Sequence, residues 1–182
     1  MKIRRIVMGL ELAPFSRPVL EAAVALAQRM EAELVGLFVE DEDLLHFAGL
    51  PFAREVGISS ATPRALDVES MERALRALAK DAQETLAALA ERTPVRWSFR
   101  VVRGSLAAEL IAAAGEADLI IANMEEPGML PESLRMRTVR ADDPDALRAA
   151  LDEEGGGILL LAGDDDARLR ELLRRLIMRE DA

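Results

Sequence analysis

The chain has 182 residues, of which 51% are hydrophobic and 31% are charged, and its formal net charge is −10 at pH 7. This length and composition predict one globular domain, and the acidic balance argues against binding to nucleic acid or to anionic membranes, because both need clustered positive charge. With no Cys and a single His, the chain has no disulfide, no thiolate nucleophile and no multi-histidine metal site.

The first third of the chain alternates between apolar runs and a helical pattern. Residues 4–10 (RRIVMGL) and 33–40 (ELVGLFVE) are apolar runs that predict two buried strands. Between them, apolar residues recur at helical spacing, with Ser16 as the N-cap and Pro18 in the first turn. The first run is too short for a signal peptide and no run approaches the roughly 18 residues of a membrane span, so we expect a cytoplasmic protein.

Residues 41–64 interrupt this alternation, because glycines and prolines break an otherwise apolar segment. We expect a short helix around residues 44–48, followed by a packed loop. A long helix over about 67–92 comes next, and its apolar positions form a single stripe. The stripe consists of Val68, Met71, Leu75, Leu78, Ala82, Leu86 and Leu89.

The next strand is predicted at an edge of the sheet. In residues 94–104 (PVRWSFRVVRG), apolar and polar residues alternate, which is typical of a strand with one exposed face. Ser105 then caps a helix over 106–116, and residues 117–123 (ADLIIAN) predict a fully buried strand.

The last third predicts a short strand over 135–141, a helix over 145–154, an apolar strand over 155–163 and a final amphipathic helix. Strands separated by helices predict an α/β fold with a parallel sheet. The aspartates at 164–166 suit either a divalent cation or the N-terminus of the last helix, and we favour the helix cap. The apolar segment 44–58 and the last helix are the candidate interaction surfaces. The last helix carries Leu169, Leu172, Leu173, Leu176 and Ile177 on one face, and we favour the interpretation that this face packs on the sheet of the chain itself.

Two stretches resemble the universal stress protein (UspA-like) family. They are ELAPFSRPVLEAAVALAQRMEAELVGLFV (11–39) and RVVRGSLAAELIAAAGEADLII (100–121), and the resemblance covers about residues 2–123. It implies a single domain over 1–182, in which 1–123 match the family pattern and 124–182 diverge. The implied fold is an open parallel sheet of about five strands in the order 3-2-1-4-5, with helices on both faces and an extra C-terminal helix. It also implies a homodimer.

The strand order implied by the resemblance places a ligand crevice beyond the carboxyl ends of the first and fourth strands, where the order reverses. Glu11 aligns with the family's loop aspartate, which helps to hold the nucleotide. Val39 aligns with the position in the second strand whose backbone meets the base.

The phosphate side of this crevice departs from the ATP-binding pattern of the family, which places several glycines after the fourth strand. Asn123 and Met124 stand where that turn would begin, and Gly128 is followed by no glycine until Gly155. Glycines allow backbone N–H groups to approach phosphate oxygens, so their loss removes the anion cradle. Adjacent glutamates at 125 and 126 add negative charge, which would repel a triphosphate unless Mg²⁺ intervened.

We therefore expect a non-catalytic UspA-like stress-response or regulatory protein that acts through protein association and needs no cofactor. Its expected partners are a second copy of the chain or another protein, and neither nucleic acid nor a membrane. The alternative is a universal stress protein that binds ATP with Mg²⁺ through an atypical loop. In that case Glu11, Val39, Asn123, Met124 and Gly128 would form the binding site, and an acid-based hydrolase is a more distant reading.

Overall fold

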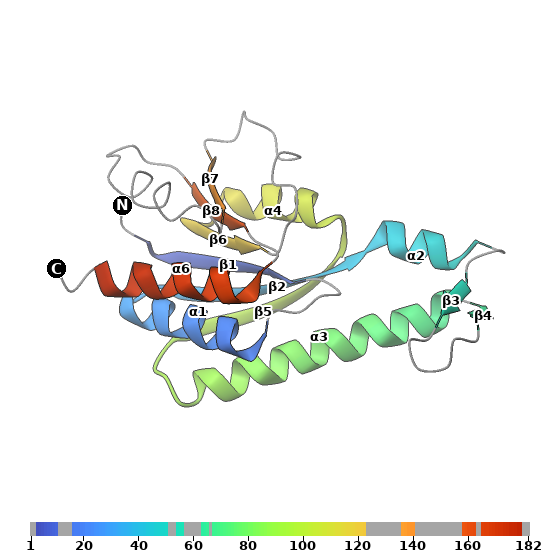
Figure 1. Cartoon of the computed structure of the whole chain (residues 1–182), viewed down its shortest axis with the longest axis horizontal. Helices are drawn as coiled ribbons and strands as arrows, with labels where there is room; N and C mark the ends of the chain where they lie inside the picture. The colour runs from blue at the N-terminus through green and yellow to red at the C-terminus, as the bar shows by residue number, and fades with distance from the viewer. Residues whose placement is uncertain are drawn as a thin grey trace.

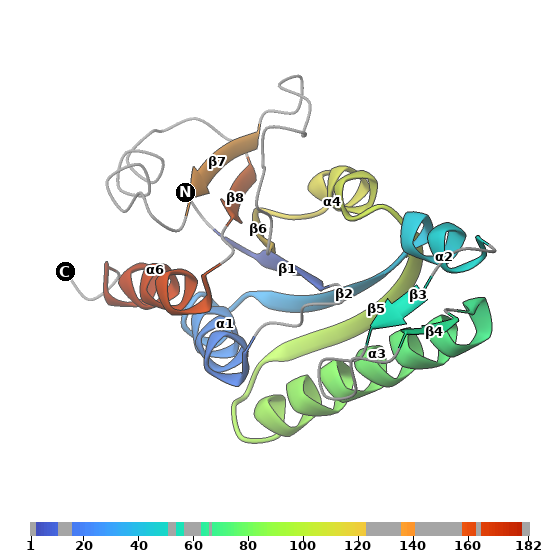
Figure 2. The ribbon, with the colours of Figure 1, turned by 45° about the vertical axis from the view of Figure 1, so that its right-hand side comes forward.

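The computed structural model describes residues 3–10, 16–50, 54–56, 63–65, 67–122, 136–140, 158–162 and 165–179. Within them, one open parallel sheet lies between layers of helices, and a short second sheet lies apart from it (Figures 1 and 2). None of the described helices is both long enough and apolar enough to cross a membrane.

The main sheet has the strand order β5-β2-β1-β6-β8-β7, and every neighbouring pair is parallel. Its strands are β1 (Arg5–Leu10), β2 (Glu33–Asp41), β5 (Arg96–Gly104), β6 (Leu119–Ala122), β7 (Met136–Arg140) and β8 (Ile158–Ala162). The first five in this order correspond to the predicted order 3-2-1-4-5, which is confirmed. The sixth, β7, lies beyond β8, so the predicted last strand is inside the sheet and β7 forms that edge.

Helices cover both faces of the sheet, as predicted (Figure 2). One face carries α1 (Arg17–Arg29), α3 (Val68–Ala90) and the extra C-terminal helix α6 (Asp166–Arg179). The other face carries α4 (Leu106–Ala114). The pleat of the strands separates two apolar clusters, because successive side chains of a strand point to opposite faces.

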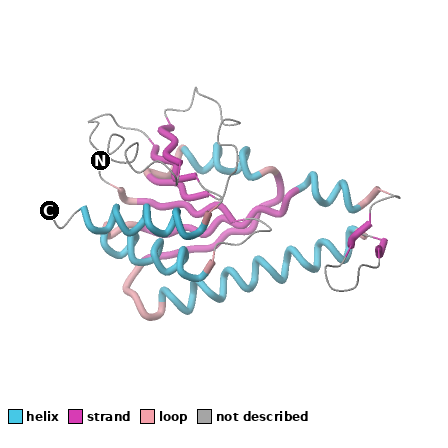
Figure 3. Tube along the Cα trace, in the orientation of Figure 1, coloured by secondary structure: helices cyan, strands magenta, loops and turns pink. Residues whose placement is uncertain are grey.

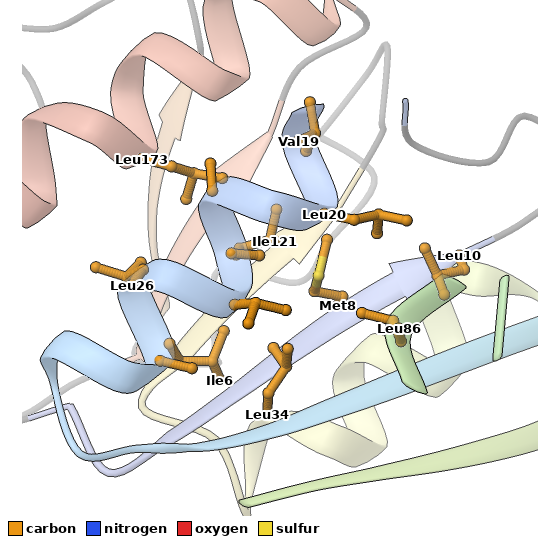
Figure 4. Packing of buried hydrophobic residues seen from close by; sticks show 14 of the residues in the cluster. Ile6, Met8, Leu10, Val19, Leu20, Leu26, Leu34, Leu86, Ile121 and Leu173 are labelled. Atoms are coloured by element: carbon orange, nitrogen blue, oxygen red, sulfur yellow. The ribbon is translucent and has the colours of Figure 1, made fainter. Parts of the chain in front are cut away.

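The larger cluster fills the space between the sheet and the three helices (Figure 4). Met8 from β1, Leu26 from α1 and Leu173 from α6 all point into it and are fully buried or nearly so. The apolar face of the last helix is likewise buried; it comprises Leu169, Leu172, Leu173 and Leu176. The favoured prediction, that this face packs within the chain, is confirmed, because the helix lies against α1 and its leucines belong to the core cluster.

The start of α1 differs in detail from the prediction. Ser16 occupies the N-cap position and Pro18 lies in the first turn, as expected, but the Ser16 side chain makes no capping hydrogen bond. Instead, the Ser16 N–H donates to Asp166 Oδ2 at 2.7 Å. A carboxylate from a helix 150 positions away in the sequence thus lies at the N-terminus of α1.

The helix α2, a short pair of strands and the start of α3 project from the sheet (Figures 1 and 3). The predicted short helix is α2 (Glu42–Ala48), capped by Asp41, whose side chain accepts from the N–H groups of Asp43 and Leu44. The antiparallel pair of β3 (Arg54–Val56) and β4 (Pro63–Ala65) was not predicted. We call α2 with Gly49 and Leu50, the β3–β4 pair, Asp67 and residues 68–74 of α3 the arm.

Candidate functional site

The strand order reverses between β1 and β6, and this reversal defines the candidate site. The chain leaves β1 towards β2 on one side of the sheet, whereas β6 and β8 extend the sheet on the other side. Parallel pairing aligns Gly9 with Ala122, so the two strands end next to each other at Leu10 and Ala122. A crevice at such a reversal is the usual ligand position in an open α/β sheet.

Four of the five predicted site residues lie outside the described part of the chain: Glu11, Asn123, Met124 and Gly128. Leu10 and Ala122, which directly precede Glu11 and Asn123, belong to neighbouring strands. The proposed roles of these four residues therefore stay predictions.

Val39 is the predicted site residue that the structure describes. Its side chain is fully buried in the smaller apolar cluster, beneath α4. The ladder between β1 and β2 ends at the pair Leu10–Phe38, whereas β2 continues to pair with β5 through Val39 and as far as Asp41. Val39 is thus the first residue of β2 beyond its described pairing with β1. This position is compatible with the predicted backbone role, and the side chain serves the core.

Charged groups at the carboxyl ends of β2 and β5 are engaged in structural contacts. Arg103 Nη2 lies 3.1 Å from Glu40 Oε2 and 3.1 Å from Glu72 Oε1, which connects β5 to β2 and to α3. The hydrogen bonds to Glu40 and then to Glu72 raise the pKa of Arg103. Because both carboxylates share this guanidinium, it holds three elements together at the carboxyl end of the sheet.

The aspartates before the last helix also have structural roles. Asp165 caps α6, because its Oδ1 accepts from the N–H groups of Ala167 and Arg168 at 2.8 and 3.2 Å. Asp166 accepts the Ser16 N–H, as described above. The favoured interpretation as a helix cap is confirmed for Asp165, and Asp164 lies outside the described residues. Sequence reasoning missed the Asp166 contact, since nothing local to 164–166 indicates a partner in the first helix.

Asp166 matters for ligand binding because of where α1 begins. The loop after β1 leads into α1, so the N-terminus of α1 belongs to the carboxyl-end side of the sheet. Backbone N–H groups at a helix N-terminus attract anions. Here a carboxylate of the chain itself already accepts the Ser16 N–H at 2.7 Å. The arrangement places negative charge where a nucleotide phosphate would need positive potential.

A separate cavity of about 120 Å³ lies between α4 and the edge strand β5. Leu37, Val102 and Ala113 contribute apolar side chains to its lining, and Arg100, Glu109 and Glu116 contribute charged ones. It lies on the α4 face of the sheet, where Leu37 is paired with Arg100 in register. No sequence pattern pointed to it, because its residues come from β2, β5, α4 and the turn after α4, and none is unusual alone.

No protein-family model and no curated protein sequence matches the chain. Similar solved structures include a protein from the universal stress protein family of Burkholderia pseudomallei, at 22% identity and a TM-score of 0.47, covering 86% of this chain and 93% of that one. The hypothetical protein PH0823 is 15% identical with a TM-score of 0.45, and the hypothetical protein MJ0577 is 12% identical with a TM-score of 0.45. Each of these two matches covers 89% of this chain and 97% of the other. The first of these structures belongs to the family that the sequence resembles.

Proposed function

We propose that this chain is a non-catalytic UspA-like protein that acts in stress response or regulation by protein association, with the nucleotide site of the family degenerate. The partner that we propose is a second copy of the chain. The observation that carries the proposal is a group of exposed apolar side chains on the arm.

The exposed group lies where α2 meets the start of α3. Phe47 is 48% exposed, Leu50 is 40% exposed and Val68 is 38% exposed. The Leu50 N–H donates to the Phe47 carbonyl at 3.1 Å, and a Cβ on the intervening Gly49 would lie 3.4 Å from Val68 Cγ2. The backbones of Phe47 and Leu50 are thus in contact, and the Val68 side chain lies beside the intervening Gly49. Exposed apolar side chains that gather at one place favour an association surface over a chance distribution.

The charged groups support the non-catalytic reading. Two of the described groups have shifted pKa values, Asp67 and Arg103, and both are bound within structural contacts. The pKa of Asp67 is lowered by hydrogen bonds from the side chain and then the backbone N–H of Ser70, which is helix capping. Arg103 connects β5 to β2 and α3. Shifted pKa values at a reactive site serve chemistry instead, and these two serve structure.

The contact between Asp166 and Ser16 supports a degenerate anion site. A phosphate that approached the Ser16 N–H would have to displace an acceptor of like charge held at 2.7 Å. The sequence after β6 also supports a degenerate anion site, because residues 123–135 contain a single glycine, Gly128.

The alternative function, nucleotide binding through an atypical loop, is favoured by one observation. The reversal between β1 and β6 is the geometry at which open α/β sheets bind ligands. Val39 also lies directly beyond the last residue of β2 that pairs with β1, at the same end of the sheet.

Sedimentation of the full chain tests the association. We expect a concentration-dependent dimer that becomes a monomer when Phe47→Ser and Leu50→Ser are combined. Met178→Ser is the matched control, because Met178 is 71% exposed on α6, at the other end of the molecule (Figure 1). A wild-type chain that stays monomeric, or a dimer that survives the arm substitutions unchanged, would contradict the proposal.

Thermal melting with millimolar ATP and Mg²⁺ separates the proposal from its alternative. We expect no upward shift for the wild type. A ligand at 100 times its dissociation constant would add about 2.7 kcal/mol of stability, which such a melt resolves easily. A clear shift that disappears in Glu11→Ala would establish the alternative instead.

A further inference from the structure

We propose that the edge of β5 that faces away from β2 binds an extended peptide segment of a partner protein, in which acidic and apolar residues alternate. The segment pairs with β5 as an additional strand of the main sheet. This edge goes beyond the proposed function and does not use the exposed apolar group of the arm. Three features of β5 carry the inference: an unpaired edge, a basic face and an apolar face.

The outer edge of β5 is long and regular (Figure 2). β5 pairs with β2 without interruption from Arg96 to Gly104, and no strand lies on its other side within the described residues. In the described part of the chain, no hydrogen bond outside this ladder involves the backbone of β5. Alternate residues of a parallel strand direct their N–H and C=O groups to opposite sides, so the outer groups are open to another strand. Sheet edges bind extended peptides in this way.

One face of this edge is basic. Arg100 lies on the side of the sheet that carries α4, because it pairs with Leu37 of the smaller apolar cluster, and Arg96 shares that side. Both arginines are exposed. Arg96 has no hydrogen bond or ion pair among the described residues, and Arg100 Nη2 lies 3.9 Å from Glu116 Oε2, at the limit of an ion pair. Both guanidinium groups therefore keep donors for carboxylates on a neighbouring strand.

The opposite face of the edge is apolar. Trp97 and Phe99 pack partly buried against the larger cluster, and Val101, which pairs with Phe38 on the same face, is 49% exposed. A neighbouring strand places its side chains beside those of β5 on both faces, with a period of two residues. The segment that fits carries carboxylates beside the two arginines and apolar side chains on the other face. This requirement is an alternation of acidic and apolar residues.

A second copy of β5 does not meet this requirement. The strand contains three arginines and no acidic residue, and like charges on neighbouring strands are destabilising. The net charge of the chain, −10, does not prevent a short acidic segment from binding. At physiological ionic strength, exposed charges more than about 8 Å apart are largely screened, so the arginines next to the segment dominate. The partner therefore supplies a short segment with local acidic charge.

Fluorescence of Trp97 reports binding at this edge directly, because the chain has a single tryptophan. The probe is the capped peptide EVEVEVE, which alternates as required and has no aromatic residue. We expect a saturable change in Trp97 emission at about 0.15 M salt. The block peptide EEEEVVV and the basic peptide KVKVKVK should bind at least about tenfold more weakly. No saturable change with EVEVEVE, or equal binding of the block peptide, would overturn the inference.

Charge reversal on the protein locates the site. We expect Arg96→Glu combined with Arg100→Glu to lose binding of EVEVEVE and to gain binding of KVKVKVK, because the same edge then carries the opposite charge. Arg170→Glu combined with Arg174→Glu, at two exposed positions of α6, is the matched control and should keep the wild-type preference. An exchange of preference cannot result from unfolding. An edge variant that still prefers EVEVEVE would refute the assignment.

A concentration series without peptide tests the choice of occupant. In the variant with Phe47→Ser and Leu50→Ser, which removes the proposed arm surface, we expect Trp97 emission to be independent of protein concentration. A concentration-dependent change would assign the edge to a second copy of the chain and overturn the proposal. The peptide titrations do not depend on the arm, so failure of the arm dimer and failure of this inference give different results.

Discussion

Phe38 and Phe47 lie nine positions apart and have opposite environments. Phe38 lies in β2 and is fully buried among α1, α3 and the sheet, whereas Phe47 lies on α2 and is 48% exposed. The sheet buries its apolar residues between layers, and the arm leaves several of its own uncovered. Apolar residues in the sheet thus stabilise the fold, whereas those on the arm, by our proposal, mediate association.

The largest expected effect comes from removing the buried ring. We expect Phe38→Ala to lower the free energy of unfolding by about 3–5 kcal/mol, because it removes a fully buried side chain and leaves a cavity. Urea denaturation followed by circular dichroism measures this loss. A loss below about 1 kcal/mol would mean that the sheet is less tightly packed than the comparison requires.

The next effect tests how closely the layers approach. A Cβ at Gly36 would lie 2.6 Å from Phe99 Cδ2 and 2.9 Å from Leu86 Cδ1, so Gly36 leaves room for the Phe99 ring of the neighbouring strand β5 and for Leu86 of α3. We expect Gly36→Ala to cost about 1–3 kcal/mol through overpacking. Gly115→Ala is the control, because the nearest atom to its added Cβ is 3.9 Å away. Equal melting temperatures for the two variants would contradict this packing.

A pH-dependent effect tests the start of α3, within the arm. Asp67 caps α3, and its lowered pKa means that its charged form stabilises the folded state. That stabilisation is present above the ordinary carboxyl pKa of about 3.9 and is lost as the pH falls through the lowered value. Asp67→Asn keeps a capping group without the charge, so we expect its difference from the wild type to shrink as the pH falls through that range. Urea midpoints over a pH series measure it.

Asp81→Asn, an exposed carboxyl in the middle of α3, is the matched control for Asp67→Asn. An identical acid response in both variants would remove the assigned role of the Asp67 cap.

The smallest expected effect is on the arm itself. We expect Phe47→Ala to change the stability of the monomer by less than about 0.5 kcal/mol, because an exposed side chain has little burial to lose. It is the same substitution as Phe38→Ala, so the pair measures the difference between the two regions directly. A loss above about 2 kcal/mol would make the arm part of the core and weaken the association proposal.

The main sheet could be predicted from sequence because its signals are local. The apolar runs of β1, β2 and β6, the helical spacing of α1 and α3, and the alternation in β5 each identify one element within a short window. The edge position of β5 followed from its polar face. For helix α6, the apolar stripe predicted which face is buried but not which element packs against it.

The remaining features depend on contacts that are distant in the sequence. The β3–β4 pair uses three-residue strands, one of which begins with Pro63, so no alternation announces it. The strand β7 precedes β8 in the chain, but β8 lies between β6 and β7 in the sheet. The pattern of a single strand does not predict this order. The Asp166–Ser16 contact joins residues 150 positions apart. The predicted site residues at 11, 123, 124 and 128 came from a resemblance, which supplies positions without geometry.

The packing of α6 against α1 has a consequence for how the chain is made. The first helix is synthesised long before the last one, and contacts between segments that are distant in the sequence form only after both have been synthesised. Until Leu169 and Leu173 emerge, the outer apolar face of α1 has no cover, and Ser16 lacks its acceptor on Asp166. The nascent polypeptide therefore exposes this apolar face of α1 until the last helix has been synthesised.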